Sequence, residues 1–151
     1  MNGKVLSFYL HQKMFGLDIN LVKEISRRVE YSHVPDSDPT VVGLMNLRGQ
    51  IVTLFDLSRI LGLTSMGFEH NKNEKSIVKN TACIILKSQG NSSNQVGFLI
   101  DDSGDVLDIQ HDWCEKTPAN VEEVRGEYIS EVVKLQEKLL LILDAERVFD
   151  R

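Results

Sequence analysis

The sequence predicts an all-β protein made of two similar small barrels with a few short helices. Apolar and polar residues alternate with a period of two in many short segments, which is typical of strands. The segments with helical signals are short, and a chain of many short strands usually forms barrels or a sandwich. The two halves of the 151-residue chain also resemble each other, which indicates a duplicated unit and therefore two barrels.

The expected strands follow one another closely along the chain. In the first of them, Leu6, Phe8 and Leu10 share one face, because successive side chains of a strand point to opposite faces. Residues 50–55 are almost all apolar, which predicts a strand buried on both faces. A polar loop at 88–94 joins two later strands as a hairpin. The full expected set covers residues 5–10, 15–19, 50–55, 81–87, 95–100, 106–109, 128–135 and 139–143.

Two short helices are expected, each after an aspartate. Asp56 can accept hydrogen bonds from the free backbone N–H groups of a helix over 57–61, and Gly62 supplies the left-handed residue that ends it. Asp144 can cap a helix over 145–149 in the same way. One further helical turn is expected within 20–25.

The internal repeat consists of blocks that occur in the same order in both halves. The longest block aligns residues 46–61 with 134–149 without a gap, so that Asp56 meets Asp144 and Arg59 meets Arg147. A unit of roughly 70 residues has a marginal core by itself. Packing or strand exchange between the two units is therefore expected. The shorter blocks align 15–17 with 96–98, 24–25 with 105–106, and Pro35 and 42–43 with Pro118 and 125–126.

This repeat predicts a single domain over residues 1–151 with two approximate subdomains. Residues 14–62 are assigned to the first barrel and residues 80–143 to the second. The polar stretch 63–79 is the expected linker, and the N- and C-terminal segments are expected to complete the barrels.

The composition argues against several classes of protein. Lys and Arg number 17 and Asp and Glu 22, for a net charge of −5, whereas counterion release favours a basic surplus in nucleic-acid binders. Nucleic acid is therefore not an expected partner, unless a basic patch is hidden in the acidic total. No signal peptide and no apolar run of roughly 20 residues is present, so we expect a cytoplasmic protein without membrane insertion. Cys83 and Cys114 lack metal-ligand spacing and are expected to be reduced core thiols.

The sequence carries no recognisable catalytic or metal-binding motif. The acidic residues from Asp101 onward lack the Gly and Glu that an EF-hand needs at its sixth and twelfth positions, and a hairpin turn at 102–104 is expected there instead. Phosphate-binding loops and the nucleophile elbow are also missing. We therefore expect no catalytic residue, cofactor or metal, and not an enzyme. None of the four histidines is spaced as a metal ligand: His11, His33, His70 and His111.

One segment is specific enough to indicate a family. Residues 42–57 read Val-Gly-Leu-Met-Asn-Leu-Arg-Gly-Gln-Ile-Val-Thr-Leu-Phe-Asp-Leu and resemble the signature of the CheW family, the coupling proteins of bacterial chemotaxis arrays. Residues 15–25, 96–107 and 139–144 resemble further blocks of that family in the same order. Two positions depart from the pattern: Thr53 stands where the family usually has Pro, and Gly104 where it has an apolar residue.

The resemblance implies both a fold and a function. The fold would be one CheW-like domain of two five-stranded β-barrels, similar to OB or SH3 barrels, with exchanged strands. The function would be an adaptor that couples the cytoplasmic tips of methyl-accepting chemoreceptors to the regulatory domain of a CheA-type histidine kinase. A CheW-like scaffold for a non-flagellar chemosensory pathway is an alternative. A small-ligand-binding β-barrel is a further one.

Arg48 is the first candidate for a contact with a partner. It lies at an expected tight turn, where its guanidinium could bond carbonyls or carboxylates of a partner. Alternatively, it ties its own loop to Glu24 or Asp56. Asn46 and Gly43 are expected to shape the turn, and Gly49 to let the backbone bend or a partner approach.

A second group of candidates precedes this turn in sequence. By the resemblance, Val22 and Glu24 belong to a block beside the receptor-binding groove. Leu21 and Val22 would line a groove between the barrels that suits an amphipathic helix. The alternative is that Val22 belongs to the core and Glu24 is a solvated charge. No motif identifies the residues that contact the kinase.

Overall fold

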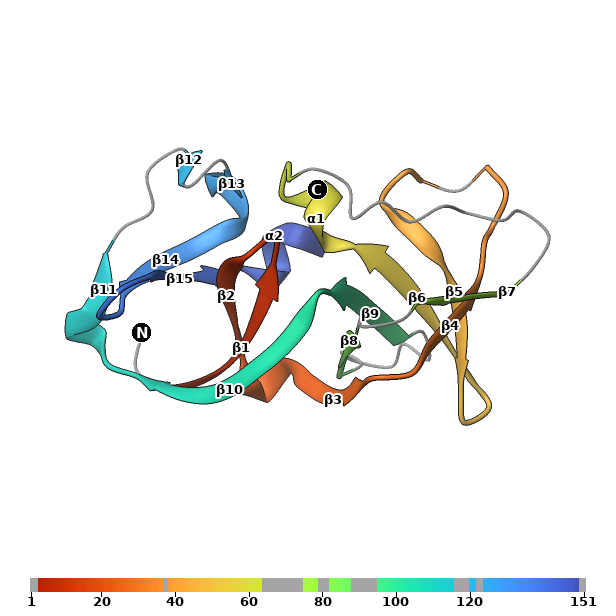
Figure 1. Ribbon diagram of the computed structural model, residues 1–151, viewed down its shortest axis with the longest axis horizontal. Coiled ribbons are helices and arrows are strands. Elements are labelled where there is room, and N and C mark those ends of the chain that lie inside the picture. The colour runs from red at the N-terminus through yellow and green to blue at the C-terminus, as the bar shows by residue number, and fades with distance from the viewer. Residues whose placement is uncertain are drawn as a thin grey trace.

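The computed structural model describes residues 3–36, 38–63, 75–78, 82–87, 95–115, 120–121 and 124–149. Within these residues, strands predominate and the helices are short, which confirms the predicted all-β class (Figure 1). Two curled sheets lie side by side along the long axis of the molecule. They share a hydrophobic core, and α1 and α2 lie near their junction.

The strands that the structure describes form two large sheets. Sheet 1 has the order β3-β8-β9-β6-β5-β4-β7, and sheet 2 has the order β10-β1-β2-β15-β14-β11; β12 and β13 form a separate pair. Sheet 1 contains β3 (Val22–Ser26), β4 (Val29–Ser32), β5 (Val41–Leu47), β6 (Gln50–Asp56), β7 (Lys75–Val78), β8 (Ala82–Leu86) and β9 (Gln95–Ile100). Sheet 2 contains β1 (Gly3–Leu10), β2 (Lys13–Asp18), β10 (Asp102–Ile109), β11 (Cys114–Glu115), β14 (Ile129–Lys134) and β15 (Leu139–Leu143). The short pair consists of β12 (Asn120–Val121) and β13 (Val124–Arg125).

Each sheet curls round on itself. In sheet 2 the outer strands β10 and β11 are consecutive in the chain and are joined by a short 3₁₀ turn at His111–Trp113. In sheet 1, β3 and β4 lie near opposite ends of the strand order, yet only two residues connect them. Strands that are far apart in the order are therefore brought close together, which is the barrel-like shape that the repeat predicted.

The two halves exchange strands, as predicted. The hairpin β1–β2 comes from the N-terminal half but lies within sheet 2, between β10 and β15. The hairpin β8–β9 comes from the C-terminal half but lies within sheet 1, between β3 and β6. The sheets thus divide the chain differently from the approximate subdomains 14–62 and 80–143, because β2 belongs to sheet 2 and β8 and β9 belong to sheet 1.

The exchanged strands pair in the same way in both halves. β9 runs parallel to β6, with Gly97 beside Leu54, and β2 runs parallel to β15, with Gly16 beside Ile142. A Cβ on either glycine would lie 3.0 Å from a methyl of that neighbour. The glycines therefore let the central strands of both sheets pack closely.

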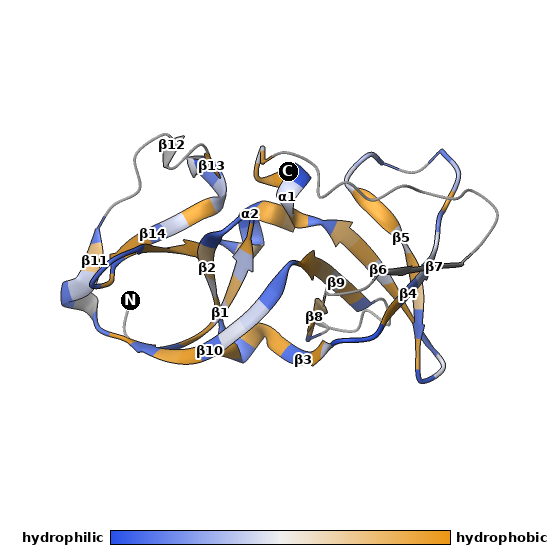
Figure 2. Cartoon of the chain, viewed as in Figure 1, coloured by the Kyte–Doolittle hydropathy of each residue, from blue (hydrophilic) through white to orange (hydrophobic). Residues whose placement is uncertain are grey.

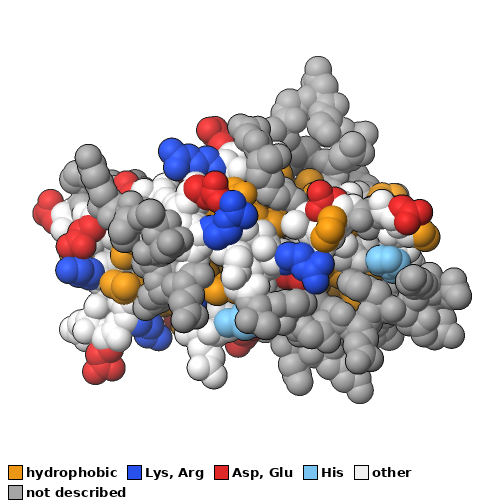
Figure 3. Space-filling model, turned by 90° about the horizontal axis from the view of Figure 1, so that it is seen from above, with side chains coloured by type: hydrophobic (Ala, Val, Ile, Leu, Met, Phe, Trp, Pro, Cys, Tyr) orange, Lys and Arg blue, Asp and Glu red, His pale blue; other side chains and the backbone are white. Residues whose placement is uncertain are grey.

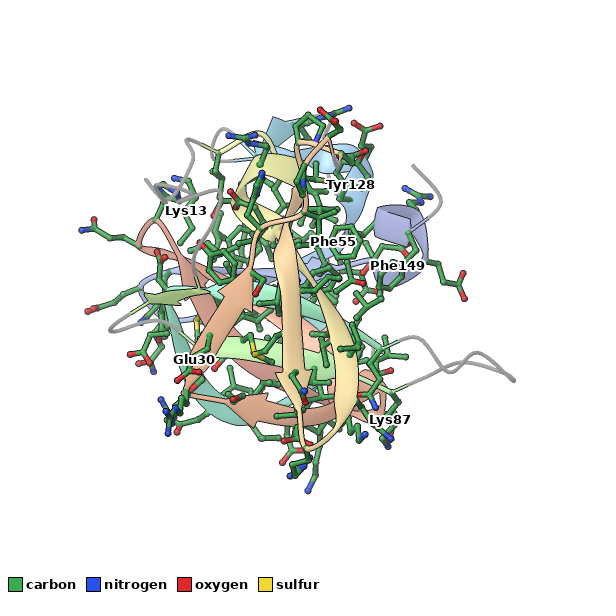
Figure 4. All side chains as sticks on the ribbon, turned by 90° about the vertical axis from the view of Figure 1, so that its right-hand side faces the viewer. Lys13, Glu30, Phe55, Lys87, Tyr128 and Phe149 are labelled. Carbon is green, nitrogen blue, oxygen red and sulfur yellow. The ribbon has the colours of Figure 1, made fainter. Side chains whose placement is uncertain are left out.

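The core has one shared part and one part inside each sheet. The largest cluster of buried residues joins both sheets and both helices, including Phe8, Phe15, Phe98, Leu57 and Val148. Phe149 stacks on Phe98 with 5.7 Å between ring centroids, and Figure 4 shows Phe149 close to Phe55 of the neighbouring β6. Strands β8 and β9 are hydrophobic along almost their whole length (Figure 2). This continuous core packs the two sheets against each other.

Both predicted helices are confirmed, with the predicted caps. The α1 helix (Leu57–Ile60) begins after Asp56, whose side chain accepts a hydrogen bond from the Arg59 N–H at 3.2 Å. The α2 helix (Ala145–Phe149) has the same bond from the Arg147 N–H to Asp144, also at 3.2 Å. Gly62 has a φ of 82°, the left-handed conformation expected of the residue that ends α1.

Several local predictions were wrong. Residues 102–104 do not form a hairpin turn but begin β10, because Ser7 of β1 donates a hydrogen bond to the Asp105 carbonyl at 2.7 Å. A side chain at Gly104 would collide with Ser7, so this departure from the family pattern makes room for a buried serine. The expected linker contains β7, which pairs with β4. The turn expected within 20–25 is a 3₁₀ turn at Ile19–Leu21, and β3 follows it at once.

One block of the proposed repeat is misaligned. Gly43 lies inside β5, whereas Gly126 begins a 3₁₀ turn, Gly126–Tyr128, before β14. Val41 pairs with Phe55 and Ile129 with Leu143, and a register break follows each pair. The structural counterpart of Gly43 is therefore Glu131. Pro118, His70 and the loop 88–94 lie outside the described residues.

Candidate functional site

The β5–β6 hairpin ends in a two-residue turn made of Arg48 and Gly49. Leu47 pairs with Gln50 on either side of it, and Arg48 and Gly49 have φ values of 51° and 85°. Positive φ at both central residues is what a type I′ turn requires. The Gly49 N–H donates to the Asn46 side-chain oxygen at 2.9 Å. Asn46 and Gly49 therefore hold the turn in shape, and the turn presents Arg48 to solvent.

Arg48 forms an ion pair with Glu24 of β3. The Arg48 Nη2 donates to Glu24 Oε2; the Arg48 side chain is 69% exposed, whereas that of Glu24 is 27% exposed. Asp56, the other intramolecular partner considered for Arg48, lies at the far end of β6 and caps α1. The pair fixes the direction of Arg48, but a solvent-exposed ion pair contributes only about 0–1 kcal/mol to stability. Most of the guanidinium remains accessible.

Gly43 has a packing role that its position in β5 explains. A Cβ at this residue would lie 2.4 Å from the Ser32 carbonyl oxygen and 2.8 Å from the Tyr31 ring. Because Ser32 of β4 pairs with Leu44 of β5, only glycine allows β4 to approach so closely. Gly43 is buried, so it can influence the contact surface only indirectly, by allowing β4 to lie close to β5.

The candidates in and before β3 lie at the edge of sheet 1. Leu21 and Val22 are half-buried and pack against the shared core. The register between β3 and β8 shifts between Val22 and Glu24, so a bulge interrupts the simple alternation that would place these two side chains on one face. The structure thus brings Glu24 to Arg48, with Leu21 and Val22 further along the same edge.

Sequence reasoning missed an apolar patch on the outer face of sheet 1. Residues 50–55 were expected to be buried on both faces, and Val52 and Leu54 are buried, but Ile51 is 54% exposed. Ile51 and Leu44 line a small pocket of about 180 Å³, together with Glu30, Tyr31, Ser32, Met45 and Asn46. β4 does not cover this face of sheet 1, and the sequence of β6 alone gives no information about where β4 lies.

Burial shifts the pKa of two titratable groups in sheet 1. Desolvation raises the pKa of Asp56 above its ordinary value, although the N–H and the charge of Arg59 oppose this shift. Burial raises the pKa of the Cys83 thiol to about 11. Cys83 is therefore a neutral core thiol, as predicted, whereas Cys114 is partly exposed and not a core residue.

The described residues offer neither a membrane-spanning helix nor a cluster of metal ligands. None of the helices among them is long and apolar enough to cross a bilayer. No group of three His, Cys, Asp or Glu side chains among them could hold a metal ion.

A CheW-like domain matches residues 4–151. The chain belongs to the CheW-like family. It is similar to the chemotaxis protein CheW of Bacillus subtilis, with 28% identity over 148 residues that cover 98% of this chain and 87% of that protein. The similarity to CheW of Thermotoga maritima is also 28%, over 97% of this chain and 87% of that protein. The family predicted from residues 42–57 is thereby confirmed.

A solved CheW-like structure has the same fold. The scaffolding protein TtCheW from Thermoanaerobacter tengcongensis superposes with a TM-score of 0.75 at 24% identity, over 95% of this chain and 84% of that one. At this level of identity the likeness concerns the fold. The chain therefore shares the fold of that protein.

Proposed function

We propose that this protein is an adaptor that couples chemoreceptors to a CheA-type histidine kinase. The observation that carries the proposal is the CheW-like match over residues 4–151, because related proteins of this length are named as chemotaxis proteins. An adaptor works by binding two partners and requires no catalytic group. The partners are the cytoplasmic helices of methyl-accepting receptors and the kinase regulatory domain, and the protein acts in the cytoplasm.

The proposed contact surface for these partners is centred on Arg48. The turn presents an arginine side chain that is 69% exposed and already oriented by Glu24, which lowers the entropic cost of binding a carboxylate or carbonyl. Leu21 and Val22 supply half-buried apolar surface nearby on the same edge of sheet 1. An amphipathic receptor helix needs both kinds of contact. Asn46 and Gly49 support the surface by holding the turn, and Gly43 by setting the position of β4.

The two alternative functions would use this fold in different ways. A scaffold for a non-flagellar chemosensory pathway would use the same surfaces with a different set of receptors and kinase. A small-ligand-binding barrel needs a pocket of roughly 300–1,000 Å³ with converging polar groups. The pocket that the described residues form beside Leu44 and Ile51 is smaller, about 180 Å³, and does not meet this requirement.

The test is co-purification with the receptor and kinase of the same organism, identified by mass. Arg48→Ala and Glu24→Lys are expected to weaken recovery of at least one partner while the melting temperature stays near that of the wild type. Gln136→Ala is the matched control, because Gln136 is the counterpart of Arg48 in the second half. If the wild type recovers neither partner, the adaptor proposal is wrong. If both variants unfold, Arg48 and Glu24 are structural and the contact surface is wrong.

A further inference from the structure

The turn between β1 and β2 holds two residues with side chains in the left-handed backbone conformation. His11 and Gln12 have φ values of 50° and 66°, and Leu10 pairs with Lys13 on either side of them. A two-residue hairpin turn with positive φ at both positions favours Asn followed by Gly, because this conformation costs free energy for a residue with a Cβ. The β1–β2 hairpin is therefore closed by a strained turn.

This strain distinguishes the β1–β2 turn from the other tight turns of the molecule. In the part of the chain that the structure describes, His11 and Gln12 are the only adjacent non-glycine residues with positive φ. The turn of β5 and β6 has Gly49 at its second position. The His11 N–H donates to Asp101 Oδ2 at 2.8 Å. Because Asp101 lies between β9 and β10, a contact from outside the hairpin holds the strained turn closed.

The strand before this turn can leave the fold only as a unit. β1 precedes every other described strand, so the turn is its one covalent link to them. It lies between β10 and β2, and Val5, Phe8 and Leu10 are fully buried there. A released β1 would expose this apolar surface to water, which is unfavourable. A second copy that has released its own β1 offers the same site, so every contact of β1 with β10 and β2 can be made again between copies.

On the face seen in Figure 3, the described hydrophobic side chains are scattered between charged and polar ones. Stable contacts between proteins have a well-packed apolar centre. The buried side of β1 carries such a surface, and it becomes available to a second copy when the turn opens.

We propose that two copies of this chain exchange β1, with the turn at 11–12 opening so that β1 and β2 form one continuous strand. Short hinges under strain favour this kind of exchange, because opening relieves the left-handed conformation in both copies. Association costs translational and rotational freedom, so the closed monomer predominates at low protein concentration and the dimer at high concentration. The exchange occurs in sheet 2 and leaves the Arg48 turn of sheet 1 in place. It therefore goes beyond the proposed adaptor function and does not depend on it.

The experiment refolds the full-length chain from urea at low and at high protein concentration and measures the dimer fraction by gel filtration with mass determination. The wild type is expected to form more dimer at high concentration. His11→Asn with Gln12→Gly relieves the strain in the closed turn and is expected to lower the association constant about tenfold. His11→Val with Gln12→Val favours extended backbone and is expected to raise it about tenfold. The control is Gln136→Asn with Glu137→Gly in the β14–β15 turn, where neither residue has a positive φ; it is expected to stay within about twofold of the wild type.

A disulfide distinguishes strand exchange from contact between intact surfaces. Lys4 of β1 pairs with Asp108 of β10, and both are exposed. Lys4→Cys with Asp108→Cys therefore places two thiols opposite each other across the strands, and Cys114→Ser removes the partly exposed natural thiol. In an exchanged dimer this disulfide joins two chains, whereas in a monomer or a surface dimer it lies within one chain. Denaturing electrophoresis of the dimer fraction without reductant is expected to show a covalent dimer.

Three outcomes would overturn the inference. In the first, the wild type and the His11→Val/Gln12→Val variant both remain monomeric at high concentration, although their melting temperatures show that they are folded. In the second, the disulfide of the dimer lies within one chain, which would assign the dimer to a surface contact. In the third, the His11→Asn/Gln12→Gly variant forms as much dimer as the wild type, so that strain in the turn does not drive the exchange. The second and third measurements do not require the valine variant to fold.

Discussion

Residues 39–61 and 127–149 repeat the same contacts in the two halves of the molecule. The Asp56 N–H donates to the Thr40 carbonyl at 2.7 Å, and the Asp144 N–H donates to the Tyr128 carbonyl at 2.8 Å. The Arg59 guanidinium donates to the Pro39 carbonyl at 2.9 Å, and that of Arg147 donates to the Glu127 carbonyl at 3.2 Å. These shared bonds satisfy backbone groups at helix and strand ends, which every copy of the unit must do.

The two halves differ at positions that are not needed to satisfy backbone hydrogen bonds. The β5–β6 and β14–β15 turns are equally long, because the Leu135 N–H donates to the Lys138 carbonyl at 3.0 Å where Leu47 pairs with Gln50. The first turn presents Arg48, whereas Gln136 stands in its place in the second. The edge strand β3 is flanked by cations, whereas β10 carries aspartates. Both halves therefore keep the backbone hydrogen bonds of the duplicated unit, whereas the turn and the edge strand of one half form the candidate contact surface.

Separating the two halves is expected to have the largest effect on folding, because each sheet contains a hairpin from the other half. Without β8 and β9, β3 loses its connection to β6, and without β1 and β2, β10 loses its connection to β15. Fragments 1–74 and 75–151 are therefore each expected to be largely unfolded alone and to assemble into a folded complex when mixed. Circular dichroism and gel filtration of the separate and mixed fragments test this. A full-length chain cut at the same bond by an inserted protease site is the control and should stay folded; a fragment that melts cooperatively by itself would contradict the exchange.

This exchange shows how far the sequence could predict the fold. Alternation and the repeat are local or self-similar signals, so eight of the strands, the caps of both helices and two exchanged units were predictable. The expected set lacked β3, β4, β5 and β7. The assignment of β2 to sheet 2 was not, because hydrogen bonds between β2 and β15 join residues that are far apart in the chain. The start of β10 was missed for a similar reason. Its Asp-Ser-Gly sequence favours a turn, but pairing with β1 and the hydrogen bond from Ser7 outweigh that preference.

The candidate site was predictable to a similar degree. Asn46 and Gly49 suit a tight turn by residue type alone, and the structure contains that turn, although it also holds Arg48 at a positive φ that its residue type does not favour. Glu24 was one of two possible partners for Arg48, and only the fold could decide between them. The patch at Leu44 and Ile51 could not be predicted from β6, because its exposure depends on where the neighbouring strand β4 lies.

The next largest loss of stability is expected for Gly43→Ala. Its Cβ would lie 2.4 Å from the Ser32 carbonyl oxygen, so β4 must move away, and we expect a loss of about 3 kcal/mol in the free energy of unfolding. The second half tolerates Glu131 at the equivalent position. Gly49→Ala is the control within the same hairpin: no atom lies within 4 Å of its Cβ, but its φ of 85° costs about 1 kcal/mol. Urea unfolding of both variants measures the difference, and equal losses would show that the close approach of β4 does not select glycine at 43.

Asp56, which caps α1, is expected to make the free energy of unfolding depend on pH. Desolvation raises the pKa of Asp56 in the folded state above its ordinary 3.8, so the folded state binds more protons than the unfolded state between these two values. Stability contributed by Asp56 is therefore present at low pH and falls as the pH rises through this window. Asp56→Asn keeps the cap and removes the ionisation, so this variant is expected to gain stability relative to the wild type as the pH rises from about 3 to 7.

The matched variants for this prediction are Asp144→Asn and Asp56→Ala. Asp144 caps the equivalent helix at a partly exposed position, so Asp144→Asn makes the same substitution at a cap that is less buried. Asp56→Ala also removes the cap and should cost about 1 kcal/mol. Chemical unfolding at several pH values measures all three. A stability difference between Asp56→Asn and the wild type that does not change with pH would show that burial of Asp56 has no energetic consequence.

The smallest expected effect on stability concerns Arg48 and Glu24. Arg48→Gln installs the residue that the second half carries at the same position, and the turn itself depends on Asn46 and Gly49. Because the Arg48 side chain is 69% exposed, a double-mutant cycle with Glu24→Gln is expected to give a coupling energy of about 0.5 kcal/mol or less, and less still at high salt. A coupling above about 2 kcal/mol would mean that the pair is a structural tie between the turn and β3. A small coupling together with a large loss of partner binding is the result expected of a residue whose main role is contact with a partner.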